Sequence, residues 1–243
     1  MEPNDAEDWM TGRIVSVNVG MPREHGTEGA AEPMERPWIT GFFKDPIVGP
    51  VHVGATNLDG DGQADLRVHG GPDKAVLLYA ASHYPDWRTE LGFAMPFGAF
   101  GENLTVEGMA EGDVCIGDVF DVGTARLEVS QPRGPCWKIA RRWKIRDLSA
   151  RVQRTGRTGW YARVLREGTV QAGDTLTLVD RPNLGWTVTL ASELLRPGNG
   201  REAEAAALAA VPALADAWRA VIEYRLAHGH IGSDEARLVG PNG

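Results

Sequence analysis

A lone thiol inside a strongly basic stretch is the first place in this sequence where chemistry could reside. Cys136 lies in residues 130–138, which read Ser-Gln-Pro-Arg-Gly-Pro-Cys-Trp-Lys, so two prolines stiffen the backbone before it. Residues 133–146 contain six basic side chains and no acidic one, in a chain of formal net charge −8: Arg133, Lys138, Arg141, Arg142, Lys144 and Arg146. Nearby cations favour a thiolate, which is a nucleophile or a soft metal ligand. The same cations could hold an anionic cofactor.

A structural interpretation of the same segment remains open. Cys136 could be a buried cysteine after a turn, with the basic residues on the solvated face of a following helix. The other thiol, Cys115, lies between Val114 and Ile116 in a predicted strand, which favours an inert core cysteine. Two cysteines in such different settings make a disulfide scaffold implausible and fit a reducing compartment.

Composition limits the class of protein. The chain has 243 residues and is 42% hydrophobic, enough for one large domain or a large domain with a small appendage. It contains no run of the roughly 20 apolar residues that a membrane span requires. We therefore expect a cytoplasmic protein with no membrane association and a disordered acidic tail over residues 1–12. The sequence pI is near 5.3, so the chain has no overall excess of positive charge, and nucleic acid is not expected as a partner.

Short β-branched and alternating segments predict a mainly β domain over residues 13–185. Such segments occur at 13–19, 51–58, 112–123, 125–129 and 175–179, and their close spacing is typical of a small barrel or sandwich. Residues 20–37 have no periodicity and predict a long loop or partly disordered insertion. The aromatic segment 38–44 predicts an exposed strand.

A glycine pair precedes a strongly apolar run. Gly70 and Gly71 permit positive φ, and Pro72 suits a helix's first turn, so we expect a helix-like run over 75–87. Its beginning could form an anion site, or these residues could simply start a helix. The Asp-Gly pairs at 59–62 predict a turn, and their spacing lacks the carboxylates of a calcium loop.

The carboxyl-terminal part of the chain has a different composition. After a predicted helix over 147–157, Ala-rich stretches at 202–210 and 213–227 are separated by Pro212, and Gly229 is a good stop signal. These features predict a small all-α unit over 190–243 that does not carry the chemistry. His228 and His230 lie near its end and indicate a solvated helix terminus.

Five segments of the chain form an ordered set of motifs. They are Val-His-Gly-Gly-Pro-Asp-Lys-Ala-Val from 68, the predicted helix through His83 and Tyr84 to Trp87, Phe-Gly-Glu-Asn-Leu from 100, Gly-Asp-Val-Phe from 117, and Val-Ser-Gln-Pro-Arg-Gly-Pro-Cys-Trp-Lys from 129. Taken in this order, they resemble the stand-alone bacterial MOSC-domain proteins of the YiiM type. The likeness covers about 13–179, and the helical tail is similar to the three-helix unit of that family. The resemblance implies a mainly β (α+β) barrel-like domain with flanking helices.

The resemblance also implies a cofactor and a reaction. The family's cofactor is a molybdenum-pterin, its sulfur ligand from the protein would be Cys136, and its reaction removes oxygen reductively from N-hydroxylated substrates such as hydroxylaminopurine. By the same resemblance, the pocket would be lined by Arg133, Lys138, Lys44, Thr40, His69, Gly70 and Gly71, with Glu102 and Asn103 nearby. Reducing N–OH to N–H needs two electrons, which no side chain can exchange, so a cofactor must supply them.

Partners and alternatives follow from the same chemistry. Two cysteines cannot ligate an iron–sulfur cluster, so electrons would arrive from a separate reductase that carries flavin or an iron–sulfur centre. Pyridoxal phosphate is not expected, and the oligomeric state stays open. Two other functions fit the residues: a molybdenum cofactor carrier without turnover, and a sulfur carrier with a persulfide on Cys136.

Overall fold

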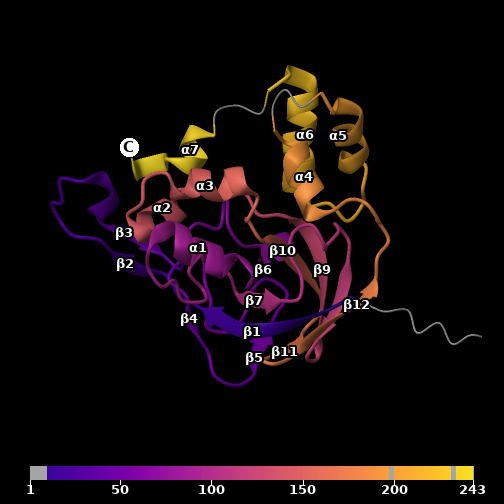
Figure 1. The fold of residues 1–243 in the computed structure, drawn as a ribbon, viewed down its shortest axis with the longest axis horizontal. Helices are drawn as coiled ribbons and strands as arrows, with labels where there is room; N and C mark the ends of the chain where they lie inside the picture. Colours follow the sequence, from indigo (N-terminus) through magenta and orange to yellow (C-terminus); the bar gives the residue numbers. More distant parts are fainter. Residues whose placement is uncertain (1–9, 197–199, 231–233, 243) are drawn as a thin grey trace, which may run out of the picture.

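The core of the protein is a closed β-barrel with helices on its outside. The computed structural model describes residues 10–196, 200–230 and 234–242 (Figure 1). Seven strands follow one another in the order β1-β7-β6-β10-β9-β8-β12, and pairing between β12 and β1 closes the ring. They are β1 (Thr11–Val19), β6 (Val76–Ala80), β7 (Leu104–Glu107), β8 (Val119–Val122), β9 (Ala125–Pro132), β10 (Trp160–Arg166) and β12 (Thr175–Asp180). The mainly β, barrel-like fold predicted from strand spacing is confirmed.

Short strands extend the barrel at its rims. β4 (Asp45–Pro46) pairs with β1, β5 (Val51–Val53) pairs with β11 (Gly168–Val170), and β2 (Arg23–His25) pairs with β3 (Trp38–Thr40). The last pair corrects the prediction for 20–37, which is not one long loop, since it also contains the 3-10 helix η1 (Pro33–Glu35). A two-strand hairpin of three residues a side is too short to give a periodic signal.

At the amino terminus, residues 1–9 of the predicted tail lie outside the described residues, whereas Thr11 and Gly12 belong to β1.

The predicted helix over 75–87 is wrong for its first half. Residues 76–80 form β6, which is buried along its whole length, and the helix α1 spans only His83–Leu91. A short continuous apolar run fits a strand that is covered on both faces as well as a buried helix, and periodicity cannot separate them. Pro72 begins only the 3-10 helix η2 (Pro72–Lys74), so no long helix opens beneath the glycine pair.

Helices cover the barrel on two sides. α1, α2 (Lys138–Trp143) and α3 (Leu148–Thr155) pack around an aromatic cluster that includes Tyr79, Trp87 and Phe100. The carboxyl-terminal helices α4 (Val188–Leu194), α5 (Glu202–Ala209) and α6 (Asp216–His228) stand together beside the barrel (Figure 1). Within the described residues, no helix is long and apolar enough to cross a membrane.

The carboxyl-terminal helices share the core of the barrel. Buried side chains of α4 and α5, among them Ala191, Leu194 and Leu208, belong to the same hydrophobic cluster as Val129 of β9. The chain then continues through α7 (Glu235–Leu238) and η3 (Gly240–Asn242), which return to the region of α2 and α3 (Figure 1). The two Ala-rich stretches are therefore helical, as predicted, and they pack on the barrel through apolar side chains.

Candidate functional site

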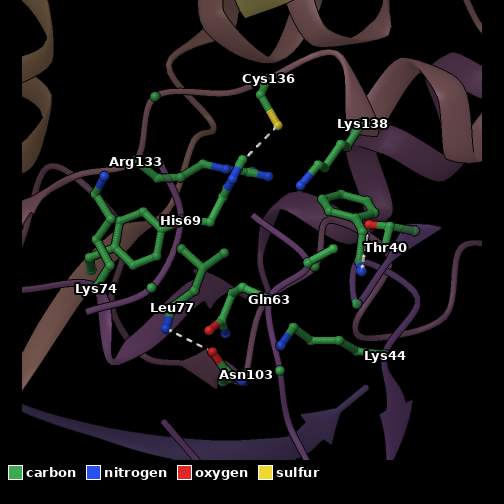
Figure 2. A pocket seen from close by; sticks show the side chains of 18 residues that line it. Thr40, Lys44, Gln63, His69, Lys74, Leu77, Asn103, Arg133, Cys136 and Lys138 are labelled. Carbon is green, nitrogen blue, oxygen red and sulfur yellow. Dashed lines mark hydrogen bonds between the residues drawn. The ribbon is translucent and has the colours of Figure 1, made fainter. Parts of the chain in front are cut away.

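A pocket forms where several loops at one rim of the barrel meet (Figure 2). The loops follow β3, β5 and β9 and precede β6 and β7, so residues far apart in the chain face one another. Of the residues that the sequence and the family resemblance suggested, these line the pocket: Thr40, Lys44, His69, Gly70, Asn103, Arg133, Cys136 and Lys138. The barrel therefore brings the thiol and most of the expected neighbours to one place.

Gly71 and Glu102 do not line this pocket. Gly71 has φ of 84° and lies at the start of η2, where it allows the chain to turn. Glu102 is fully buried beside the pocket, and its carboxylate accepts hydrogen bonds from the backbone N–H groups of Gly98 (2.7 Å) and Phe100 (3.1 Å). Glu102 therefore fixes the loop before β7 instead of facing a ligand.

The thiol of Cys136 faces an imidazole. Its Sγ lies 3.8 Å from Nε2 of His69, and Figure 2 shows both side chains pointing toward each other. Burial, followed by the charges of Lys138, Lys74 and Arg133, lowers the pKa of His69 to about 4. Its ring is therefore neutral near pH 7. The Nδ1 atom of His69 is buried and has no hydrogen-bond partner among the described residues.

Positive charge dominates the wall of the pocket. Four lining side chains are cationic, namely Lys44, Lys74, Arg133 and Lys138, and no lining residue is Asp or Glu. Arg133 donates to the carbonyl oxygens of Phe100 (2.9 Å) and Thr158 (3.4 Å). Carbonyl partners orient this guanidinium without neutralising it.

Two lysines of this wall, Lys74 and Lys138, are partly desolvated. Burial lowers the pKa of Lys138, against the opposing effects of Cys136 and Asp65, and burial likewise lowers the pKa of Lys74. Lys74 Nζ donates to the carbonyl oxygen of Val68 at 3.0 Å. In the described part of the chain, Lys74, Arg133 and Lys138 form no ion pair with a carboxylate within 4.0 Å. Desolvated cations without a counter-charge attract an anion, so this wall is suited to a phosphate-bearing ligand.

The floor of the pocket is a buried polar network. Lys44 forms an ion pair with Asp61, whose side chain is fully buried. The carboxylate of Asp61 also accepts hydrogen bonds from the Gly20 N–H (2.9 Å) and from Asn103 Nδ2 (2.9 Å). Asn103 Oδ1 in turn accepts from the Leu77 N–H at 3.1 Å, as the dashed line in Figure 2 shows. Burial lowers the pKa of Lys44, whereas the attraction of Asp61 opposes this.

Sequence reasoning missed several members of this site. Gln63, Lys74 and Tyr161 line the pocket, and Asp61 lies behind Lys44. Asp61 belongs to the predicted Asp-Gly turn, and its partner is a lysine, not a metal ion. Because a turn carboxylate is usually solvated, nothing local indicates that Asp61 is buried. Lys74 lies three residues after the glycine pair, and this position was the one available signal.

The donor set fits an anionic metal–pterin group. The pocket offers one soft sulfur atom, three cations (Lys74, Arg133 and Lys138) with no carboxylate partner among the described residues, and neutral hydrogen-bonding groups on His69 and Gln63. A thiolate suits a soft metal centre, and unpaired cations suit a phosphate. Fold and pocket together define a β-barrel protein with a thiol inside a positively charged pocket.

Comparisons with known proteins agree with this description. The MOSC domain matches residues 65–177. The "Uncharacterized protein YflK" of Bacillus subtilis (strain 168) is 42% identical over 207 residues, which are 85% of this chain and 91% of that protein. The crystal structure of YiiM from Geobacillus stearothermophilus superposes with a TM-score of 0.74 at 35% identity, and the match covers 88% of this chain and 99% of that one. The chain belongs to the MOSC-domain family and is of the YiiM type.

A third relative carries a functional name. A protein called "Reductase" from Gibberella moniliformis (strain M3125 / FGSC 7600) is 41% identical over 164 residues, which are 66% of this chain but 29% of that protein. This chain thus spans less than a third of that relative's length.

Proposed function

We propose that the protein is a molybdenum-pterin oxidoreductase that reduces N-hydroxylated substrates, such as hydroxylaminopurine-like bases, to amines. The observation that carries the proposal is the thiol of Cys136 in a pocket with four cationic side chains and no carboxylate on its wall. The similarity to a protein named "Reductase" supports the redox class of the reaction.

Each part of the pocket has a role in this proposal. Cys136 would be the protein's ligand to molybdenum, and Arg133 and Lys74 would hold the phosphate of the pterin. The cofactor supplies the two-electron exchange that amino-acid side chains cannot provide. His69, which is neutral near pH 7, adds no positive charge next to the sulfur and can donate a hydrogen bond to it through Nε2.

The protons require a separate source. Reduction of a hydroxylamine consumes two electrons and two protons, forms an N–H bond and releases the oxygen as water. Lys138 is suited to deliver one proton from Nζ, because burial lowers its pKa and makes that proton easier to release than in a solvated lysine. Electrons would come from a separate flavin or iron–sulfur reductase in a reducing compartment such as the cytoplasm.

The test is elemental analysis of protein made in a host that synthesises the cofactor. We expect about one molybdenum per chain, pterin fluorescence after oxidation, and oxidation of a reduced dye that depends on an N-hydroxylated base. A cofactor carrier would contain molybdenum but would not oxidise the dye, and a sulfur carrier would show labile sulfur by mass spectrometry. Protein from a competent host that contains neither molybdenum nor pterin would contradict the proposal.

A further inference from the structure

The last described residues of the chain lie against the loop that carries Cys136. This loop, residues 133–137, connects β9 to α2. The segment that contacts it, residues 234–242, contains α7 and η3 and is called the C-terminal segment below. Figure 1 shows α7 next to α2 and α3, at the carboxyl end of the chain. About a hundred residues of sequence separate the two segments.

Hydrogen bonds from the C-terminal segment reach the residues on both sides of Cys136. Arg237 Nη1 donates to the carbonyl oxygen of Pro135, and the carbonyl oxygen of Arg237 accepts from the Trp137 N–H at 2.7 Å. Asn242 Nδ2 donates to the carbonyl oxygen of Trp137 at 3.0 Å. The backbone is therefore fixed immediately before and immediately after the thiol.

Arg237 is itself held in place. Its Nη2 atom donates to Asp234 Oδ1 (2.6 Å) and to Gln153 Oε1, and Gln153 Nε2 donates to Asp234 Oδ2 at 2.8 Å. Gln153 belongs to α3, so the network ties the C-terminal segment to the helix beside the thiol loop. Charge-assisted hydrogen bonds from a planar guanidinium fix direction as well as distance.

Packing at Gly240 completes the contact. A Cβ atom on Gly240 would lie 2.4 Å from Cδ1 of Trp137, and Gly240 has φ of 50°. Only glycine lets the C-terminal segment lie this close to the indole ring. Any larger residue at this position would push the segment away from the thiol loop.

The loop has little regular secondary structure of its own, so contacts from neighbouring segments help to fix its shape. Residues 133–137 belong neither to a helix nor, after Pro132, to a strand, and Gly134 has no side chain to pack. Inside the barrel domain, the carbonyl oxygen of Cys136 accepts from Ser149 Oγ at 2.8 Å. The neighbouring carbonyl groups of Pro135 and Trp137 both accept hydrogen bonds from side chains of the C-terminal segment.

We propose that Arg237 is a positioning residue for Cys136, and that the C-terminal segment holds the thiol at the pocket. A ligand atom must be placed to within roughly half an ångström for a metal site to work, so freedom in this loop would weaken both thiol placement and metal binding. The consequence for turnover rests on the proposed function, whereas the consequence for the thiol itself does not.

The experiment measures how fast iodoacetamide alkylates Cys136 in the cofactor-free wild-type protein and in each variant. Peptide mass spectrometry monitors the reaction. Arg237→Met removes the side-chain hydrogen bonds of Arg237, and Gly240→Ala displaces the C-terminal segment. Arg237→Lys keeps the positive charge but lacks the planar guanidinium group. We expect about fivefold faster alkylation in the first two variants, since each frees the loop, and an intermediate rate for the lysine variant. The buried Cys115 provides an internal reference for global unfolding.

Arg219→Met is the matched control. Arg219 also donates to backbone carbonyl oxygens in the helical unit, those of Val211 (3.2 Å) and Leu214 (3.0 Å), but these lie away from the thiol loop. We expect wild-type alkylation of Cys136 in this variant. Folded Arg237→Met and Gly240→Ala proteins that react at the wild-type rate would overturn the proposal, and so would equal acceleration in Arg219→Met.

A second measurement separates this proposal from the proposed function. In molybdenum-loaded protein, Arg237→Met should lower kcat several-fold with little change in KM, because the residue does not line the thiol pocket, and Arg237→Lys should restore part of kcat. If all proteins, wild type included, lack molybdenum while the alkylation rates still differ as expected, the positioning role stands and the proposed function fails. A loss of kcat of equal size in Arg219→Met would instead indicate general loosening of the protein and would contradict the role.

Discussion

The two cysteines of this protein have opposite surroundings. Cys115 is 2% exposed, forms an isolated β-bridge with Thr187, and lies beside the core of the barrel. Burial raises the pKa of its thiol. Cys136 is half-buried and opens into the pocket with its four cationic side chains.

Both thiols have charged neighbours, so the number of charges does not separate them. Near Cys115, Asp118 accepts a hydrogen bond from the Cys115 N–H at 2.8 Å and pairs with Arg181 at 2.6 Å. This cation and this anion neutralise each other. Near Cys136, the cations on Arg133 and Lys138 have no carboxylate partner in the described part of the chain. Charge balance, more than charge count, therefore separates the two thiols: the charges near Cys115 cancel, whereas the cations near Cys136 are suited to an anion.

The sharpest test of this comparison is replacement of each cysteine. We expect Cys136→Ser to lower turnover of an N-hydroxylated base by about 100-fold or more, because a hydroxyl is hardly ionised near pH 7 and is a poor soft ligand. A reduced-dye assay, a molybdenum measurement and circular dichroism on each variant check this result. Near wild-type turnover in Cys136→Ser would show that the thiol is structural and would favour the carrier function.

The floor of the pocket should be the most sensitive part of the site to loss of a charge. Asp61→Asn leaves the buried cation of Lys44 without its partner, so we expect the free energy of unfolding to fall by about 3 kcal/mol. Lys44→Met should cost less, since the Asp61 carboxylate keeps its bonds from Gly20 and Asn103. Urea denaturation measures both effects. Asp65→Asn removes a carboxylate that pairs with the exposed guanidinium of Arg67 and accepts from the Arg67 N–H, so it should change stability far less than Asp61→Asn. Equal losses in all three variants would contradict the burial argument.

His69 makes the thiol pocket sensitive to acid. Its pKa is about 4 in the folded protein and 6.5 without the fold, so the unfolded chain takes up the proton first as pH falls. Wild-type protein should therefore lose stability relative to His69→Gln between pH 6.5 and 4, by at most about 3 kcal/mol, and lose no more below that range. Denaturation curves of both proteins at several pH values provide the measurement. A stability difference that stays constant with pH would show that His69 is not desolvated.

Cys115 should give the smallest effect. Cys115→Ala removes one buried sulfur atom from the core, which we expect to cost on the order of 1 kcal/mol of stability with turnover per folded molecule unchanged. Thermal denaturation and the reduced-dye assay measure the two quantities. Loss of turnover in folded Cys115→Ala would remove the distinction between the two thiols.

Part of the fold and site could be predicted from local sequence. The alternation over 13–19 predicted β1, and the Ala-rich stretch with Gly229 predicted α6. Arg133 and Lys138 were expected near Cys136 because they lie within three residues of it, and no fold can separate such neighbours by much. The helix over 75–87 failed because residues 76–80 are buried by contacts on both faces, which come from distant segments.

Other parts of the site depend on contacts that no local pattern encodes. Lys44 and Asp61 are separated by the two short strands β4 and β5 and the loops that follow them, and closure of the barrel places them together at the pocket floor. Arg237 reaches Pro135 only because α4 to α6 pack on the barrel and return the chain toward α3. The C-terminal helices were predicted, but their contact with the thiol loop was not.

The sequence by itself determined the chemical types at the site: one thiol after a proline-rich turn, a local excess of positive charge, and glycines at 70 and 71 that allow positive φ. The tertiary structure decided which of those charges are neutralised. Asp61 neutralises Lys44 and Asp118 neutralises Arg181, whereas Arg133 and Lys138 face the thiol pocket and form no ion pair with a carboxylate of the described residues. The reason is that electrostatic energy depends on distance and burial, and both are set by the long-range pairing that closes the barrel.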